Sequence, residues 1–105
     1  MLSKYLDKEK IIEAYSGDGI WLDEIENQIL KILNSKTINL TSEELKQLGK
    51  ARELIIILNK MNYIVVETES KEYFGKYNIE IYELYSEMKI DLTKMLGIED
   101  IWEEM

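Results

Sequence analysis

Histidine and cysteine are both absent from this chain of 105 residues. Without histidine, the chain lacks the side chain that most often serves as a general base at neutral pH and as a transition-metal ligand. Without cysteine, it lacks a thiol nucleophile, disulfide bonds and the thiolate ligands of structural zinc sites. We therefore expect no cofactor and no metal site, and a fold that is held together by packing alone.

Motifs for nucleotide and calcium binding are missing as well. Neither GxxxxGKS, GxxxxGKT nor GxGxxG occurs in the sequence. A calcium loop centred on Gly19 fails, because Ala14 and Ile25 would occupy its first and last ligand positions. Carboxylate pairs such as Asp23 with Glu26 could do acid–base work. At helical spacing on an acidic chain, a solvated helix face explains them better, so we predict that the protein is not an enzyme.

Proline is also absent, and glycine occurs only five times. So few turn-forming residues leave little material for loops, which favours helices over a fold of many short strands. The length fits one domain, and 46% hydrophobic with 32% charged residues is typical of a globular protein. We predict a mainly α protein, a compact bundle of four or five helices that forms a single acidic globular domain over residues 1–105.

Long hydrophobic segments are lacking too. The longest uncharged apolar run, Leu54 to Leu58, is far shorter than the roughly 20 residues that span a bilayer. The start of the sequence carries Lys4, Asp7 and Lys8 and has no apolar region of the kind found in signal peptides. We expect a cytoplasmic protein with no membrane partner.

Two helices are expected in the first third of the chain. Ser3 is placed to cap a helix over residues 3–15, which two glycines then end. Apolar residues at spacings of three and four, from Leu22 to Leu33, predict a second helix over residues 23–34.

A third helix has the clearest start signal. Thr41 and Glu44 form a capping box, in which each side chain can satisfy a backbone N–H at the helix start, and Leu40 is placed to begin a hydrophobic staple. The residues expected to face the core are Leu45, Leu48, Ala51, Ile55, Leu58 and Met61. Because residues 54–58 are apolar on all sides, we predict that this helix is the buried central element. Gly49 indicates either a close helix contact or a break.

Residues 63–85 leave two interpretations open. The β-branched content of 63–68 and the alternation over 77–83 predict a small β-hairpin. Apolar residues at helical spacings predict a helix instead, with Leu84 facing inward, and length favours the helix for residues 77–89.

The end of the chain suggests a further helix. Ile90 falls off the apolar stripe and Asp91 is a good N-cap, so we expect a helix to restart at residue 91, with Ile90 and Met95 as a second staple. Gly97 suits its C-terminus, and a last acidic-aromatic turn surrounds Trp102.

The order of elements resembles a winged helix-turn-helix. The resemblance rests on residues 38–45 (INLTSEEL) and 58–65 (LNKMNYIV) and covers about half of the chain. It implies an α+β fold and, as an alternative function, a DNA-binding transcriptional regulator. Basic side chains for phosphate contact are sparse, which argues against DNA binding but not against a winged helix used for protein contact.

Net charge is −8 and unevenly distributed. Residues 62–105 hold eleven acidic and four basic residues, whereas residues 1–61 are nearly balanced. An acidic surface repels nucleic acid and attracts basic surfaces. Such a surface also keeps a small domain dispersed, which is the simpler explanation.

Aromatic side chains are interleaved with the acidic ones in this part of the chain. Exposed Tyr and Trp are good anchors at interfaces, and carboxylates around them would steer a basic partner. The alternative is that most of these aromatic side chains belong to the core. The residues that we expect to bind a partner are Tyr73, Glu80, Tyr82, Glu83, Glu87, Glu99, Asp100, Trp102 and Glu103.

The main hypothesis is a non-catalytic protein-binding module whose acidic surface engages the basic groove of a nucleic-acid-handling protein, as nucleic-acid mimics do. An inhibitor encoded by a phage or other mobile element fits this description, and so does an immunity protein for a toxin nuclease. Direct binding to nucleic acid is not expected. Apolar residues off the main helical stripes, such as Ile56, Ile79 and Ile90, leave a homodimer open.

Overall fold

The computed structural model describes the backbone of residues 2–15, 20–69 and 76–103, and the side chains within these ranges except those of residues 63–69 and 76–79. In chain order, the elements are the 3-10 helix η1 (Leu2–Tyr5), the α-helices α1 (Lys8–Ala14), α2 (Ile20–Asn34), α3 (Ser42–Glu69) and α4 (Lys76–Leu96), and the 3-10 helix η2 (Glu99–Trp102). The described residues thus form four α-helices and no strand, which confirms the mainly α prediction.

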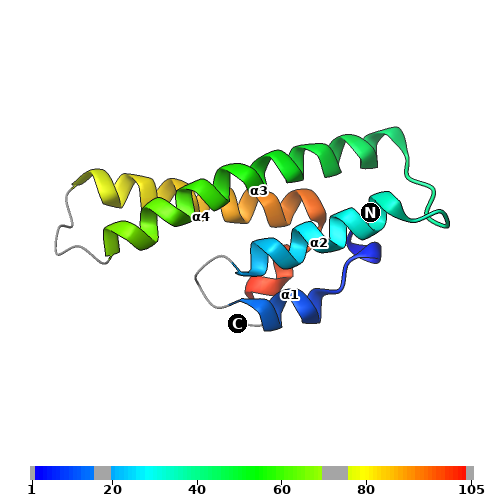
Figure 1. Cartoon of the computed structure of the whole chain (residues 1–105), viewed down its shortest axis with the longest axis horizontal. Coiled ribbons are helices and arrows are strands. Elements are labelled where there is room, and N and C mark those ends of the chain that lie inside the picture. Colours follow the sequence, from blue (N-terminus) through cyan, green and yellow to red (C-terminus); the bar gives the residue numbers. More distant parts are fainter. Residues whose placement is uncertain (1, 16–19, 70–75, 104–105) are drawn as a thin grey trace.

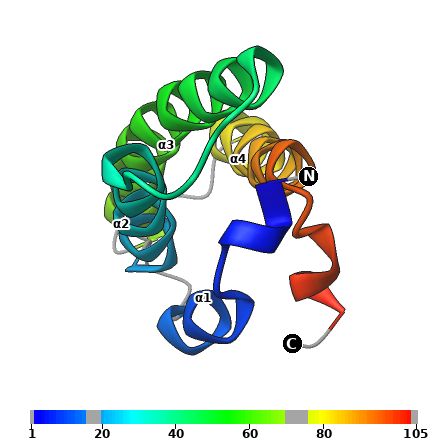
Figure 2. The ribbon, with the colours of Figure 1, turned by 90° about the vertical axis from the view of Figure 1, so that its right-hand side faces the viewer.

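The long helices α3 and α4 pack against each other as an antiparallel pair (Figure 1). They run along the longest dimension of a molecule that measures 50 × 25 × 21 Å. The shorter helices α1, α2, η1 and η2 all lie on one side of this pair (Figure 2). The opposite side of α3 and α4 is therefore covered by no other described element.

The first segment is divided at Asp7, so the prediction of one helix over residues 3–15 with a Ser3 cap is wrong. Asp7 has an extended backbone and caps α1, with its carboxylate accepting from the Lys10 amide. Gln28 of α2 holds both backbone groups of Asp7, accepting from its N–H at 2.7 Å and donating to its carbonyl at 3.1 Å. These bonds satisfy the backbone outside a helix, which sequence periodicity does not reveal.

Helix α2 supplies much of the core. It begins at Ile20, earlier than the predicted residue 23, and buries one face. The buried apolar side chains of this helix are Trp21, Leu22, Ile25, Ile29 and Ile32. This face packs towards α1 on one side and α3 on the other, which makes α2 the link between the short helices and the long pair.

The capping box at the start of α3 is confirmed. The Thr41 amide donates to Glu44 Oε1 at 3.0 Å, and the Glu44 amide donates to Thr41 Oγ1 at 3.1 Å. The predicted inward position of Leu45 is wrong, because half of this side chain is exposed, whereas Leu40 packs against the core. The box therefore fixes the helix start without a buried staple partner at Leu45.

The middle of α3 is less buried than expected. Ile55 and Leu58 are fully buried, but Ile56 is 56% exposed and Ile57 is 45% exposed, so the prediction of an all-round buried element is wrong. Only one side of α3 meets other helices, and the other side of the apolar run faces solvent. Both readings of Gly49 are also wrong, since α3 continues through it and nothing lies within 4 Å of a Cβ built there.

Of the two interpretations of residues 63–85, the hairpin at 63–68 and 77–83 is wrong, and with it the winged-helix architecture, whereas the helix favoured for residues 77–89 is confirmed. The first segment belongs to α3 and the second to α4. Tyr85 and Leu92 are buried on one side of α4, and the Tyr85 hydroxyl donates to Asn62 Oδ1 of α3 at 3.1 Å. The packing of α3 against α4 outweighs the local β-propensity.

The predicted helix restart at Asp91 is wrong as well, because α4 is continuous from Lys76 to Leu96. Its end at Gly97 is confirmed: this residue has φ 70°, and its amide donates to the Lys94 carbonyl at 3.1 Å. The Ile98 amide donates to the Thr93 carbonyl at 2.9 Å, which completes a Schellman motif. The motif turns the chain back, so that Ile98 becomes fully buried.

Candidate binding surface on α4 and the C-terminal turn

Four carboxylates form a stripe along the outer side of α4, which we name the acidic ridge: Glu80, Glu83, Glu87 and Asp91. Their spacings of three and four residues place them on one helix face, and all four are exposed. None has an ion pair with another described residue. At 1.5 Å per residue, the ridge is about 16 Å long.

Exposed apolar side chains, Leu84 and Ile90, flank the acidic ridge, and Tyr82 is exposed on another face of α4. Tyr82 is 48% exposed, Leu84 51% and Ile90 44%. The exposure of Tyr82 agrees with its predicted place on the surface. The inward position predicted for Leu84 is wrong, because the buried stripe of α4 passes through Tyr85 and leaves Leu84 at its edge.

Trp102 belongs to an aromatic cluster and is only partly exposed. Its ring meets that of Trp21 edge-on, with centroids 5.4 Å apart, and that of Tyr15 in the same way at 5.7 Å. The Trp102 indole N–H donates to Thr93 Oγ1 at 3.0 Å. These contacts fix η2 against α2 and α4, so Trp102 is first a packing residue and its predicted role as a free anchor is not supported by its surroundings.

Lys89 points into the same cluster. Its ammonium lies 5.0 Å from the ring centroid of Tyr85, 5.4 Å from that of Trp102 and 5.9 Å from that of Tyr15. Burial lowers the pKa of Lys89. The three ring faces stabilise the ammonium by cation–π attraction and take the place of a carboxylate partner.

A cleft of about 630 Å³ opens between α4 and η2 beside this cluster. Its lining residues are Tyr15, Ser86, Lys89, Ile90, Glu99, Asp100, Trp102 and Glu103. Four of the predicted partner-binding residues therefore meet at one place. The Lys89 ammonium lies against the aromatic rings of the cleft, and the carboxylates of Glu99, Asp100 and Glu103 line its opening. The cleft therefore presents charges of both signs and selects neither an anion nor a cation.

Asp100 is engaged within the molecule. Its Oδ2 lies 2.8 Å from Lys8 Nζ, which joins η2 to α1 across the molecule. This hydrogen bond lowers the pKa of Asp100. Of the predicted carboxylates on η2 and just after it, Glu99 and Glu103 are exposed and Asp100 is only partly exposed.

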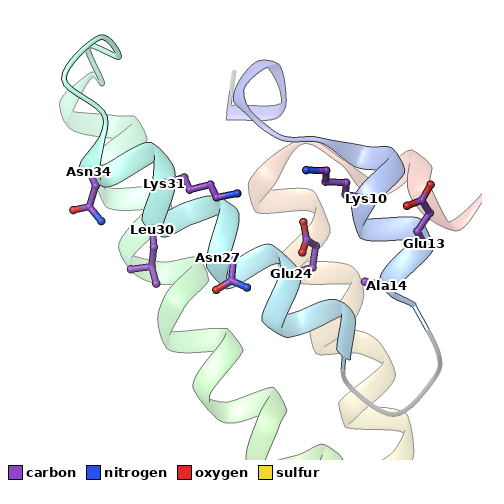
Figure 3. A pocket seen from close by; sticks show the side chains of 8 residues that line it. All are labelled: Lys10, Glu13, Ala14, Glu24, Asn27, Leu30, Lys31 and Asn34. Atoms are coloured by element: carbon purple, nitrogen blue, oxygen red, sulfur yellow. The ribbon is translucent and has the colours of Figure 1, made fainter.

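Figure 3 shows a second hollow, of about 910 Å³, between the facing sides of α1 and α2. Lys10 and Glu13 reach into it from α1, and Glu24 and Lys31 from α2. Charges of both signs lie around a wide opening, which gives a small molecule little enclosure. We assign no function to this hollow.

Groups of three or more potential metal ligands do not occur in the described parts of the chain. No described helix is both long and apolar enough to cross a lipid bilayer. No family model, curated protein or solved structure matches this chain. Its own residues must therefore carry any argument about function.

The structure separates the predicted partner-binding residues into three groups. Glu80, Glu83 and Glu87 share one exposed face of α4, Tyr82 is exposed on another face, and Glu99 and Glu103 are exposed near η2. Asp100 and Trp102 are held by internal contacts. Tyr73 lies outside the described residues.

Sequence reasoning missed Asp91, Leu84 and Lys89 as parts of this surface. The spacing of Asp91 from Glu87 was available as a signal, but the expected helix break at residue 91 concealed it. No local signal marks Lys89, because its ring partners Tyr15 and Trp102 come from distant parts of the sequence.

Proposed function

We propose that this protein is a non-catalytic binding module whose acidic ridge engages a basic groove on a nucleic-acid-handling protein. The observation that carries the proposal is the acidic ridge itself, an exposed row of carboxylates with no ion pair to any described residue. Like charges at helical spacing destabilise a helix slightly. A partner with a basic surface would relieve that repulsion.

The charge density of the ridge suits a surface that normally holds nucleic acid. Four carboxylates over about 16 Å compare with about five phosphates over the same length of one DNA strand. The ridge therefore offers a basic groove nearly the charge of a single strand. Glu99 and Glu103 add two exposed carboxylates beyond the end of α4.

Side chains beside the ridge would supply the contacts that charge alone does not. Leu84 and Ile90 lie beside it on α4 and are each about half exposed. Aromatic and apolar anchors next to charged groups are typical of protein interfaces, where anchors contribute affinity and charges contribute steering. The proposed order of events is electrostatic capture by the ridge, followed by burial of Leu84 and Ile90.

The same surface would repel nucleic acid, so the proposed partner is the protein and not its nucleic acid. An inhibitor from a phage or other mobile element and an immunity protein for a toxin nuclease would both bind such a groove. The proposal includes a cytoplasmic location, where the partner would meet its own nucleic acid.

Capture from a cognate host lysate, treated with nuclease, tests the proposal. We expect tagged wild-type protein to retain a protein that is released by added DNA, because DNA and the ridge would compete for one groove. The variant Glu80→Lys/Glu83→Lys/Glu87→Lys should lose this protein. The control Glu9→Lys/Glu13→Lys/Glu53→Lys changes the net charge equally on α1 and α3, at exposed positions away from the ridge, and should retain it.

Two results would refute this function. One is equal capture by the ridge variant and the wild type. The other is a captured protein that excess DNA does not release. Both variants should first be shown to be helical by circular dichroism, so that loss of binding cannot reflect unfolding.

A further inference from the structure

The cleft between α4 and η2 holds a positive charge that no carboxylate of the described residues neutralises. Lys89 lines this cleft and is only partly exposed, and its ammonium has no ion pair with a described residue. The three rings around it attract a cation, but their faces are weaker hydrogen-bond acceptors than a carboxylate. An anionic group bound here would gain a charge-assisted hydrogen bond in a place that is partly shielded from water.

Negative charges at the opening of the same cleft are unpaired as well. Glu99 and Glu103 line the cleft, are exposed, and form no ion pair within the described parts of the chain. Asp100 also lines it, but its carboxylate is engaged by Lys8. The cleft thus combines an unpaired ammonium on α4 with two unpaired carboxylates on η2 and just after it.

Apolar and aromatic side chains complete the lining. Tyr15 and Trp102 contribute rings, and Ile90 contributes an exposed aliphatic side chain. The volume of about 630 Å³ lies within the roughly 300–1,000 Å³ of small-molecule sites. An apolar body can therefore contact these side chains while charged groups of the same ligand meet Lys89 and the two glutamates.

A ligand with a single charge would meet one attraction and one repulsion in this cleft, whereas a zwitterion meets two attractions. Because both kinds of charge line one cleft, the two charges of the ligand must lie close together, as they do in a free α-amino acid. We propose that the cleft binds a free α-amino acid with an apolar or aromatic side chain, its carboxylate at Lys89 and its ammonium at Glu99 and Glu103. None of the four carboxylates of the acidic ridge lines the cleft, so this site is separate from the proposed protein interface.

Phenylalanine and two blocked derivatives test this proposal on the protein alone. The indole N–H signal of Trp102 in heteronuclear NMR spectra reports binding, because this side chain lines the cleft. We expect phenylalanine to shift the signal saturably, with a dissociation constant on the order of 1 mM. N-acetylphenylalanine keeps only the negative charge and phenylalanine amide only the positive charge, and both should bind at least about tenfold more weakly. These derivatives also resemble the last and the first residue of a peptide, so they distinguish a free amino acid from a chain end.

Lys89→Met keeps an unbranched side chain and removes its charge. It should weaken phenylalanine binding at least about tenfold but strengthen binding of phenylalanine amide, since the repulsion is gone and the rings are left for another ammonium.

Glu99→Gln/Glu103→Gln changes two exposed positions and should leave the packing intact. This variant should also weaken phenylalanine binding, while N-acetylphenylalanine should bind more tightly because its negative charge is no longer repelled. The matched control is Glu43→Gln/Glu53→Gln, which removes two exposed carboxylates of α3 that do not line the cleft. It should bind phenylalanine as the wild type does.

An indole signal that does not move up to about 20 mM phenylalanine would overturn the inference. So would blocked derivatives that bind as tightly as phenylalanine, or a Lys89→Met variant that is still helical by circular dichroism and binds phenylalanine undiminished. No partner protein takes part in these titrations, so their outcome is independent of capture by the acidic ridge, and the two proposals fail separately.

Discussion

Lys8 Nζ and Asp100 Oδ2 lie 2.8 Å apart, although 92 positions separate the two residues in the sequence. The pair joins the first α-helix to the last turn and closes the ring of short helices beneath α3 and α4 (Figure 2). Both side chains are partly exposed, so the pair contributes little at neutral pH.

The pH dependence of stability should nevertheless reveal the Lys8–Asp100 pair. The pKa of Asp100 is below its ordinary value of 3.8, so the folded state binds this proton less tightly than the unfolded state does. Its contribution is present above pH 3.8 and is lost as pH falls through the lower folded value. We expect Asp100→Asn to flatten the fall in melting temperature below pH 4, relative to a Glu99→Gln control. Identical acid profiles of the two variants would show that the pair is not formed.

Lys89 should also make stability rise with pH, but in the alkaline range. Burial lowers its pKa from the ordinary 10.5, so the unfolded state holds this proton more tightly than the folded state. Stability should therefore rise as pH increases towards 10.5, and Lys89→Met should remove that rise. Chemical denaturation of the wild type and of Lys89→Met between pH 8 and pH 10 gives the free energy of unfolding of each protein. The tyrosines titrate in both proteins, so their contribution cancels in the difference between the two. A rise of equal size in Lys89→Met would contradict the burial of this ammonium.

Two glycine-to-alanine substitutions should act in opposite directions. Gly97 has φ 70°, where an alanine is strained, so Gly97→Ala should destabilise the fold by about 1–2 kcal/mol. Gly49 lies inside α3 with free space around it, so Gly49→Ala should stabilise by up to about 1 kcal/mol. Urea unfolding of both variants and of the wild type measures whether each substitution raises or lowers the free energy of unfolding. A loss of stability in Gly49→Ala would mean that α3 is broken or closely contacted there.

Thr93 should be the most sensitive polar position of the C-terminal turn. It is fully buried, and its hydroxyl accepts from the Trp102 indole at 3.0 Å while donating to the Ile90 carbonyl at 2.9 Å. Thr93→Val keeps the shape and removes both bonds, so it should cost about 1–2 kcal/mol and shift the Trp102 fluorescence. Ser86→Ala loses only an exposed bond to the Tyr82 carbonyl and should cost less than about 0.5 kcal/mol. Equal losses would show that the indole bond contributes nothing.

The sequence predicted those features of the fold that depend on a few neighbouring residues. The capping box of Thr41 and Glu44 and the helix end at Gly97 appear as predicted, because both rest on bonds within five residues. The mainly α class followed from the lack of turn-forming residues. Tyr82, Glu83 and Glu87 were likewise placed correctly on the surface, since charge and helical spacing are enough to indicate exposure.

Other features depended on contacts between distant segments. The break at Asp7 needs Gln28, and the aromatic surroundings of Lys89 need both Tyr15 and Trp102. For residues 63–68 and 77–83, local β-propensity and helical periodicity disagreed, and the pairing of α3 with α4 decided for the helix.

Composition and local spacing thus determined by themselves that this chain is helical and acidic and contains neither histidine nor cysteine. Only the tertiary structure decided which side of each helix is buried. An apolar run such as residues 54–58 can bury any of its sides, and the choice depends on which neighbouring helices lie within reach. Because α1 and α2 pack on one side of α3 and α4, Ile57 and the acidic ridge remain on the surface.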